Sequence, residues 1–332
     1  MPKGSLVRAV RVGTLLLSIL WSSTAFGEAP LFPRPAELAG AVEFWKRIFA
    51  VYRTDQGVVH DKEDLTVVYG VEWLGGRAEQ GRERERQRTQ ASVLGRYRGV
   101  LRRFAEGRVD TARLAGDELR VWNALGGTAD RARYRRAMEN LRLQVGQRDR
   151  FERGLAASRP YLEDVRRILR THGVSDSLAV LPFIESAFDL RASSKAGAVG
   201  PWQIIRSTGR RFLRINRRVD ERRDPLKATA AAARILKENY QFLGTWPLAI
   251  TAYNHGPGGM ARAVKTVGTR DIATIIKRYK GKAFGFASRN FYPEFLAALE
   301  VIHHWQTYYG ELPSSSLAEE TGSDKGRDRG GR

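Results

Sequence analysis

The chain has 332 residues, with 57 Lys and Arg against 36 Asp and Glu, and therefore a formal net charge of +21. Its 42% hydrophobic content and modest numbers of Gly and Pro exclude a wholly disordered or collagen-like chain. At about 100 to 200 residues per domain, the length allows about two domains. Because the chain has no cysteine, disulfide frameworks, zinc ribbons, iron–sulfur clusters and thiol nucleophiles are excluded.

The first 27 residues have the three parts of a secretory signal peptide. Three basic residues precede an apolar run over residues 12–21, and Ala25 and Gly27 supply the small residues of a cleavage site before Glu28. The run is well short of the roughly 20 residues that a transmembrane helix needs. We therefore expect residues 1–27 to be a cleaved signal peptide and the mature chain to have no membrane span. An uncleaved anchor is the alternative.

Export argues against nucleic acid, which is the partner that a strongly basic chain first suggests. The sequence contains no RNA-binding aromatic signature, no zinc finger and no basic region leading into heptads. Residues 77–150 are rich in Arg and contain no Lys, but apolar residues recur among them at helical spacing. We interpret this region as solvated helix faces of mixed charge; a polyanion-binding surface, for nucleic acid or for an acidic cell-wall or outer-membrane polymer, is the alternative.

The mature chain begins with a helical N-terminal region over residues 28–159, to which we assign no role. An apolar stripe from Leu38 to Tyr52 predicts its first helix, and the run 65–69 is either a short strand or part of a helix. Two further apolar stripes, over 93–104 and 134–145, predict later helices.

Residues 160–312 show a clearer helical pattern and form the second predicted domain. Gly173 is expected to end one helix, and Asp224 followed by Pro225 is expected to begin another. The polar residues 313–332 predict a disordered tail. The expected fold class is therefore all-α.

One carboxylate in this second domain has the surroundings of a general acid. Glu185 ends an apolar segment and is flanked by Phe183, Ile184 and Phe188. Burial in such surroundings disfavours the charged form and raises the pKa of a carboxyl group, which allows it to donate a proton near neutral pH. The alternative is a helix cap or an ion-pair partner.

Two later motifs supply groups that suit a sugar polymer. The first, residues 194–203, ends in Trp202 and Gln203; the second, residues 252–256, contains Tyr253 and Asn254. Aromatic faces can stack on sugar rings and amide side chains can orient hydroxyl groups, so the combination with a carboxylic acid suits a neutral, hydroxyl-rich polymer. Nothing in these motifs suits phosphoryl transfer.

In this order, Glu185-Ser186, Gly197-x-x-Gly200-x-Trp202-Gln203 and Ala252-Tyr253-Asn254-x-Gly256 resemble the motifs of the soluble lytic transglycosylase (SLT) family, which has a goose-type lysozyme fold. The residues around Glu185 are most similar to the membrane-bound lytic murein transglycosylase D branch. The resemblance covers residues 160–309. It implies a lysozyme-like domain that cleaves the MurNAc–GlcNAc β-1,4 bond of peptidoglycan without water and leaves a 1,6-anhydroMurNAc end.

The resemblance also implies roles for particular residues. Glu185 would act first as the acid and then as the base. From the residues that follow it, we interpret Asp189, the other nearby carboxylate, as a cap or an ion-pair partner where the helix ends; a second catalytic group is the alternative. Pro201 stands where the family usually has Leu or Met, at an expected helix start. The positions that would line the cleft and bind substrate are Ser194, Trp202, Gln203, Tyr253, Asn254 and Tyr292.

The expected partner is the peptidoglycan glycan strand in the periplasm, with no cofactor and no metal site, because the five His lack the spacing of metal ligands. The chain shows neither the LysM modules nor the lipid-modified cysteine usual in the resembled branch, so wall binding would rest on the N-terminal region or on charge. We interpret the positive charge as long-range attraction to an anionic wall or membrane surface. A hydrolase of the same fold and a non-catalytic wall-binding or scaffolding protein are the alternative functions.

Overall fold

The computed structural model describes residues 31–75 and 83–311. The predicted signal peptide and the predicted tail lie outside these residues. The chain divides into two units, Met1–Leu31 and Phe32–Arg332, and the second unit contains every helix and strand of the described residues. The division between residues 159 and 160 stays a prediction.

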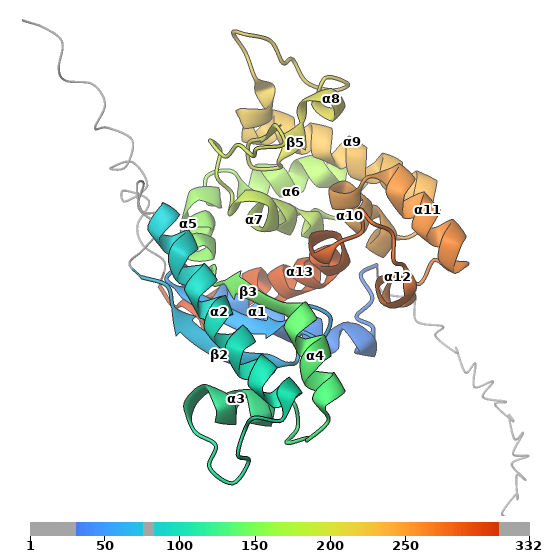
Figure 1. The fold of residues 1–332 in the computed structure, drawn as a ribbon. Coiled ribbons are helices and arrows are strands. Elements are labelled where there is room, and N and C mark those ends of the chain that lie inside the picture. Colours follow the sequence, from blue (N-terminus) through green and yellow to red (C-terminus); the bar gives the residue numbers. More distant parts are fainter. Residues whose placement is uncertain (1–30, 76–82, 312–332) are drawn as a thin grey trace, which may run out of the picture. The chain divides into compact units, whose positions relative to one another are not determined.

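Helices dominate this unit, which confirms the expected fold class (Figure 1). Its first elements are α1 (Ala39–Ala50), β1 (Gln56–Asp61), β2 (Val68–Trp73), α2 (Glu83–Glu106), α3 (Gly116–Ala124), α4 (Arg131–Asn140), β3 (Leu141–Val145) and α5 (Arg148–Ser158). They are followed by α6 (Leu162–Thr171), α7 (Leu181–Ser186), β4 (Ala198–Val199), β5 (Ile204–Ile205), α8 (Arg206–Gly209), α9 (Pro225–Leu243), α10 (Trp246–His255), α11 (Pro257–Val267), α12 (Ile272–Arg278), α13 (Phe286–His303) and α14 (Trp305–Tyr309).

The N-terminal region is not helical throughout, because it contains an antiparallel sheet with the strand order β2-β1-β3. The sequence allows a short strand at residues 65–69; the strand in the structure, β2, lies slightly later, at Val68–Trp73. The apolar stripe predicted as one helix over 134–145 is wrong in its second half, since α4 ends at Asn140 and β3 begins at Leu141. The alternation of Leu141, Leu143 and Val145 with polar residues has the two-residue period of a strand.

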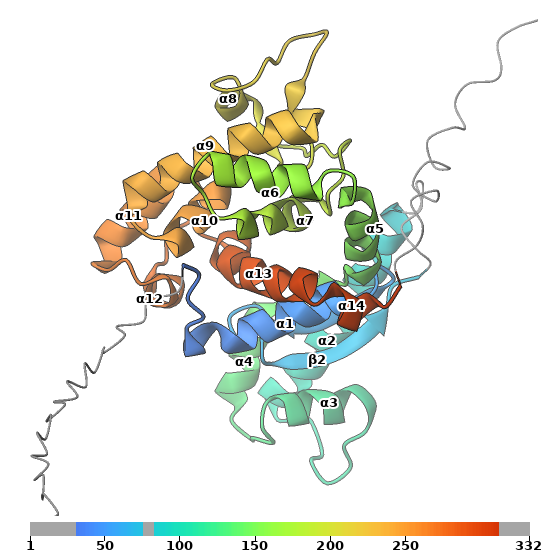
Figure 2. The same ribbon diagram turned by 180° about the vertical axis from the view of Figure 1, so that it is seen from behind.

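The central strand β1 separates two hydrophobic cores. Its neighbours Val58 and Val59 are both fully buried, but Val58 belongs to the main core and Val59 to a smaller one with α2 and α4. Successive residues of a strand point to opposite faces, so the sheet is covered on both sides. Figures 1 and 2 show α2 over one face and α1 with α13 toward the other.

Helix α1 packs along α13 and so joins the N-terminal region to the C-terminal half. The indole N–H of Trp45 donates to Asn290 Oδ1 at 3.0 Å, and Lys46 forms a 2.6 Å ion pair with Glu300. The side chains of α1 and α13 therefore belong to one continuous core that extends from Leu38 to Tyr309.

The C-terminal half forms its helices at the predicted signals. Asp224 accepts hydrogen bonds from the backbone N–H groups of Leu226 and Lys227, both at 3.0 Å, and Pro225 is the first residue of α9. Gly173 follows α6 with a φ of +71°, as a C-terminal glycine should. Within the described ranges, no helix has the length and apolar character needed to cross a membrane.

Candidate active site

The short helix α7 presents Glu185 near its C-terminal end. A 3₁₀ segment, Asp176–Val180, leads into α7, and Pro182 lies in its first turn, where a missing N–H is tolerated. Leu181 and Phe183 are fully buried. The apolar side of this helix therefore anchors it, and Glu185 remains partly accessible to solvent.

The chain reverses immediately after Glu185 in an uncommon conformation. Ala187 and Phe188 both have positive φ, at 55° and 57°. Their N–H groups donate to Phe183 O at 2.9 Å and to Pro182 O at 3.0 Å, so two carbonyl groups of the short helix are satisfied by the turn. A left-handed backbone at two residues without glycine is unfavourable and persists only where surrounding contacts fix it. This turn therefore holds the end of α7 in one geometry.

Ser186 connects the turn to the hairpin formed by β4 and β5. Its hydroxyl oxygen lies 3.0 Å from the carbonyl oxygen of Pro201 and accepts a hydrogen bond from Asp189 N–H at 3.1 Å. The position expected for Pro201 is thus wrong: it lies in the turn between two strands and not at a helix start. Proline is accommodated because its carbonyl, and not an N–H, makes the contact.

Glu185 has the electrostatic environment that its neighbours in the sequence predict. Burial raises the pKa of its carboxyl group from 4.5 to about 8. No hydrogen bond or ion pair to another described residue satisfies this carboxyl group. It is therefore protonated at neutral pH and free to donate its proton to a substrate.

A second carboxyl group, which sequence reasoning missed, is Glu294 on α13. Burial raises its pKa to about 8, and the negative charge of Glu185 acts in the same direction, so the two carboxyl groups interact. Asp189, the candidate nearest in the sequence, instead accepts a 2.7 Å hydrogen bond from Arg191 N–H within its own loop. No local motif marks Glu294, because only the packing of α13 against α7 relates it to Glu185.

An arginine from the sheet of the N-terminal region faces the same helix. The guanidinium carbon of Arg142 on β3 lies 4.0 Å from the ring centroid of Phe286, at the start of α13. Its positive charge lowers the pKa of Glu294, against the effects of burial and Glu185. The N-terminal region therefore contributes to the electrostatics of the active site.

The predicted Ser194 and Gln203 shape the hairpin next to Glu185. Ser194 Oγ accepts from Ala198 N–H at 3.0 Å. Gln203 has a φ of 46°, and its side-chain amide donates to Gly200 O at 2.8 Å. Both side chains therefore form hydrogen bonds within the hairpin.

The motif at the end of α10 faces this hairpin. The Tyr253 hydroxyl donates to Trp202 O at 2.8 Å, and its pKa is raised well above the usual value by burial and by the charge of Glu185. Tyr253 therefore lies close to Glu185. Asn254 is exposed, and its Oδ1 accepts from the Ser288 hydroxyl at 3.0 Å. Its amide nitrogen has no hydrogen-bond partner among the described residues.

Two of the six residues predicted to bind substrate, Trp202 and Tyr292, are instead buried in the core. Trp202 is 0% exposed and donates from its indole to Thr229 Oγ1 at 2.9 Å, so it is a core residue and cannot stack on a sugar. Tyr292 is fully buried, and its hydroxyl donates to Pro33 O at 2.8 Å. Residues 292 and 294 lie about 200° apart on a helix, so Tyr292 points away from the side that carries Glu294.

Replacing Glu294 by Gln should change the pH dependence of stability. A folded-state pKa of about 8 against 4.5 means that the native state binds a proton which the unfolded state has lost. The stability from this group is full below pH 4.5 and is lost as the pH rises to about 8. At about 1.4 kcal/mol per pKa unit, Glu294→Gln should be about 2 to 4 kcal/mol more stable than the wild type at pH 8.

At pH 4 the two proteins should have similar stability, because Glu294 is then protonated in both states. Urea titrations at several pH values measure this difference. Glu163→Gln, at a side chain that is 80% exposed and forms a surface ion pair with Arg170, is the matched control; because such a pair contributes at most about 1 kcal/mol, this variant should stay close to the wild type. A constant difference between Glu294→Gln and the wild type at every pH would contradict the raised pKa.

Comparison with known proteins agrees with this geometry. Residues 167–276 match the family model described as the transglycosylase SLT domain. These residues are an SLT domain. They include α7 with Glu185, the β4–β5 hairpin, and Tyr253 and Asn254 on α10, so most of the candidate site lies within the matched residues. The lysozyme-like class expected for this half is thereby confirmed.

Curated relatives match part of the chain. The membrane-bound lytic murein transglycosylase D of Escherichia coli K12 is 33% identical over 165 residues, which are 47% of this chain and 34% of that protein. A putative tributyltin chloride resistance protein of Alteromonas sp. M-1 is 32% identical over 114 residues, 34% of this chain and 55% of that protein. The chain thus spans about a third to about half of the length of these relatives.

A solved structure of the lytic transglycosylase Slt from Pseudomonas aeruginosa, an inactive mutant, is also similar. It covers 67% of this chain and 38% of its own, with 20% sequence identity and a TM-score of 0.39.

Proposed function

We propose that this chain is a peptidoglycan lytic transglycosylase that cleaves the MurNAc–GlcNAc β-1,4 bond in the periplasm. The observation that carries the proposal is a partly buried glutamic acid, Glu185, with a pKa of about 8, which lies within the residues that match the SLT domain model. The E. coli relative is named a lytic murein transglycosylase.

The first step requires only an acid. Protonated Glu185 donates its proton to the glycosidic oxygen, the bond between that oxygen and MurNAc C1 breaks, and GlcNAc leaves with a free hydroxyl group. The acetamido oxygen of MurNAc stabilises the positive charge that develops at C1. Glu185 is left as a carboxylate.

The second step returns the proton. The C6 hydroxyl of the same MurNAc attacks C1, and the Glu185 carboxylate accepts the hydroxyl proton, which forms the 1,6-anhydro ring and restores the acid. An attached nucleophile has a far higher effective concentration than water. No water is consumed and no second catalytic group is required.

The protonation state of Glu294 bears on the alternative function, which is hydrolysis with two carboxylates. A hydrolase needs one carboxyl group as acid and another, ionised, as base or nucleophile. The pKa of Glu294 is about 8, so this group is mostly protonated at neutral pH and is a poor base. The charges at the site therefore favour the mechanism in which the substrate supplies its own nucleophile.

The test is a digest of purified sacculi, followed by separation and mass analysis of the released fragments. We expect fragments with 1,6-anhydroMurNAc ends. Fragments heavier by one water would establish a hydrolase, and binding to sacculi without release would favour a scaffolding role; either result would overturn the proposal.

A further inference from the structure

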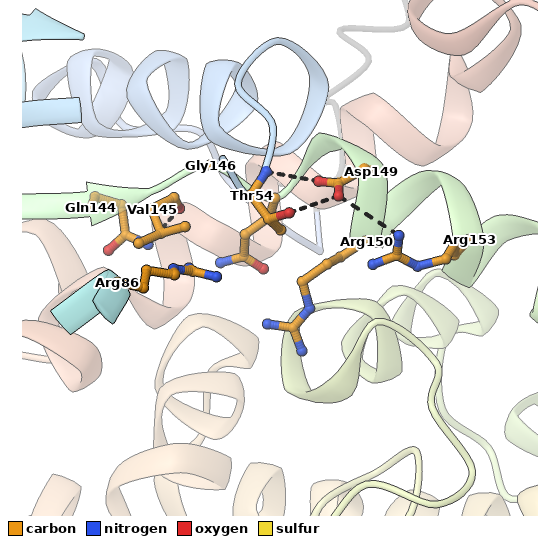
Figure 3. A pocket seen from close by; sticks show the side chains of 9 residues that line it. Thr54, Arg86, Gln144, Val145, Gly146, Asp149, Arg150 and Arg153 are labelled. Carbon is orange, nitrogen blue, oxygen red and sulfur yellow. Dashed lines mark hydrogen bonds and ion pairs between the residues drawn. The ribbon is translucent and has the colours of Figure 1, made fainter. Parts of the chain in front are cut away.

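A cavity of about 440 Å³ lies where α2, β3 and α5 meet, outside the active site (Figure 3). Its walls are mainly polar. They include three arginines, Arg86 from α2 and Arg150 and Arg153 from α5, together with Gln144, Gln147 and Asp149. Guanidinium groups are well suited to bind carboxylate and phosphate groups, so three of them around one cavity suit an anionic ligand.

The cavity lining contains one carboxylate, Asp149, which already has hydrogen-bond partners. Asp149 accepts from Thr54 N–H at 2.8 Å and from the Thr54 hydroxyl at 2.7 Å, and these bonds, against the effect of burial, hold its pKa below the usual value. Its remaining interaction is a 3.6 Å ion pair with Arg153. Asp149 therefore compensates at most one of the three positive charges.

The other two arginines have no ion pair with a described residue. Figure 3 shows Arg86 and Arg150 without an interaction to any lining residue, while Arg153 points to Asp149. The Nε of Arg86 is buried and has no hydrogen-bond partner among the described residues. An unsatisfied buried donor is unfavourable, and an anion would satisfy it.

The position of Arg150 adds to this imbalance. Burial lowers the pKa of its guanidinium group, the positive charges of Arg153 and Arg86 act in the same direction, and the carboxylates of Asp149 and Asp189 oppose them. Arginine nevertheless stays charged, and its planar donors fit a carboxylate in a bidentate manner. The cavity therefore suits a ligand with a carboxylate group.

The cavity lies beside the turn that follows the catalytic glutamate. Gly154 on α5 packs so closely against Ala187 that a Cβ at residue 154 would lie 2.6 Å from the Ala187 carbonyl oxygen. Arg150 is one helical turn, about 5.4 Å, before Gly154 on the same side of α5. The cavity is therefore within reach of a short peptide attached to a sugar near the cleaved bond.

We infer that this cavity binds a carboxylate of the peptide stem carried by the peptidoglycan strand, with Arg86 and Arg150 as its ligands. The inference rests on the proposed function, because that function supplies a substrate whose MurNAc residues carry carboxylate-bearing peptides. The N-terminal region, to which the sequence alone assigns no role, then selects strands that retain their peptides.

The binding test uses the full chain and the free tetrapeptide stem, which contains no glycosidic bond. Calorimetry should show binding to the wild type and at least about tenfold weaker binding to Arg150→Gln, in line with the loss of one charge-assisted bidentate contact. Arg113→Gln, which removes the same charge at a side chain that is 88% exposed, is the matched control and should bind like the wild type. Circular dichroism checks that both variants are folded.

The chemistry of the ligand is tested in two further arms. A stem whose carboxylates are amidated should not bind. Inorganic phosphate that binds as tightly as the stem would show a general anion site and would overturn the assignment to peptide carboxylates. Equal binding of the stem by the wild type and Arg150→Gln would overturn it as well.

The activity test separates this inference from the proposed function. On strands that carry peptides, Arg150→Gln should raise KM with little change in kcat, and on strands stripped of peptides by an amidase it should match the wild type. An equal loss on both substrates would contradict peptide recognition. No cleavage by the wild type would instead refute the proposed function, and the tetrapeptide result would still stand.

Discussion

Replacing Glu185 by Gln should abolish release of anhydro fragments from sacculi and leave the fold unchanged. Gln has nearly the same shape but cannot donate a proton to the leaving oxygen, and loss of a general acid typically slows a reaction by about a hundredfold to ten-thousandfold. The variant should also be at least as stable as the wild type at pH 8, because a carboxyl group with a raised pKa has been removed. Fragment release and urea unfolding measure the two effects.

Glu163→Gln is the control for this experiment, since it makes the same change at an exposed side chain on α6. It should cleave sacculi at the rate of the wild type. For the wild type itself, cleavage should decline as the pH rises through about 8, where Glu185 loses the proton it must donate. Full activity of Glu185→Gln would refute the assignment of the acid.

Gly200→Ala should unfold the β4–β5 hairpin and destabilise the protein by about 3 kcal/mol or more. Gly200 has a φ of +77°, and a Cβ there would lie 1.9 Å from the Arg222 carbonyl oxygen, a backbone atom that cannot rotate away. Arg222 is itself fixed, because it is 3% exposed and donates to Gly197 O and Ile204 O at 2.9 and 3.0 Å. Chemical denaturation measures the loss.

The matched control for Gly200→Ala is Gly99→Ala on α2. Gly99 has an ordinary φ, and no atom lies within 4 Å of a Cβ built there. Ala should therefore stabilise that helix by about 0.5 to 1 kcal/mol. If Gly200→Ala were as stable as the wild type, the close contact between the hairpin and Arg222 would be wrong.

The sequence reveals Glu185 but not Glu294, and the difference has a physical cause. Glu185 lies among apolar neighbours in its own helix, so its burial can be inferred locally. Glu294 reaches the site only through the packing of α13 against α7, which no local pattern encodes. The electrostatic effect of Glu185 on Glu294 appears only when both helices are placed.

Aromatic residues show a second limit of sequence patterns. Trp202 and Tyr292 can serve either as sugar platforms or as core residues, and composition does not distinguish these uses. The structure buries both, because Thr229 and Pro33 supply the hydrogen-bond acceptors that a buried indole or hydroxyl group requires. Tyr253, by contrast, is placed near Glu185 as expected.

The sheet of the N-terminal region is only partly predictable from the sequence. The run Gln56–Asp61 is buried on both faces, so it lacks the alternation that marks a strand with one solvent-exposed face. The helix predicted over 93–104 is confirmed, since Val93, Tyr97, Leu101 and Phe104 are all buried on α2. A helix with one apolar side can be recognised from its period, whereas a short strand buried on both faces cannot.

The central claim is that the bond is broken without water, and one measurement tests it most directly. Sacculi are digested in water enriched in heavy oxygen, and the new MurNAc ends are examined by mass spectrometry. We predict 1,6-anhydro ends that contain no heavy oxygen, because the C6 hydroxyl of the sugar is the nucleophile. Heavy oxygen at C1 of the released MurNAc ends would show attack by water and would contradict the account.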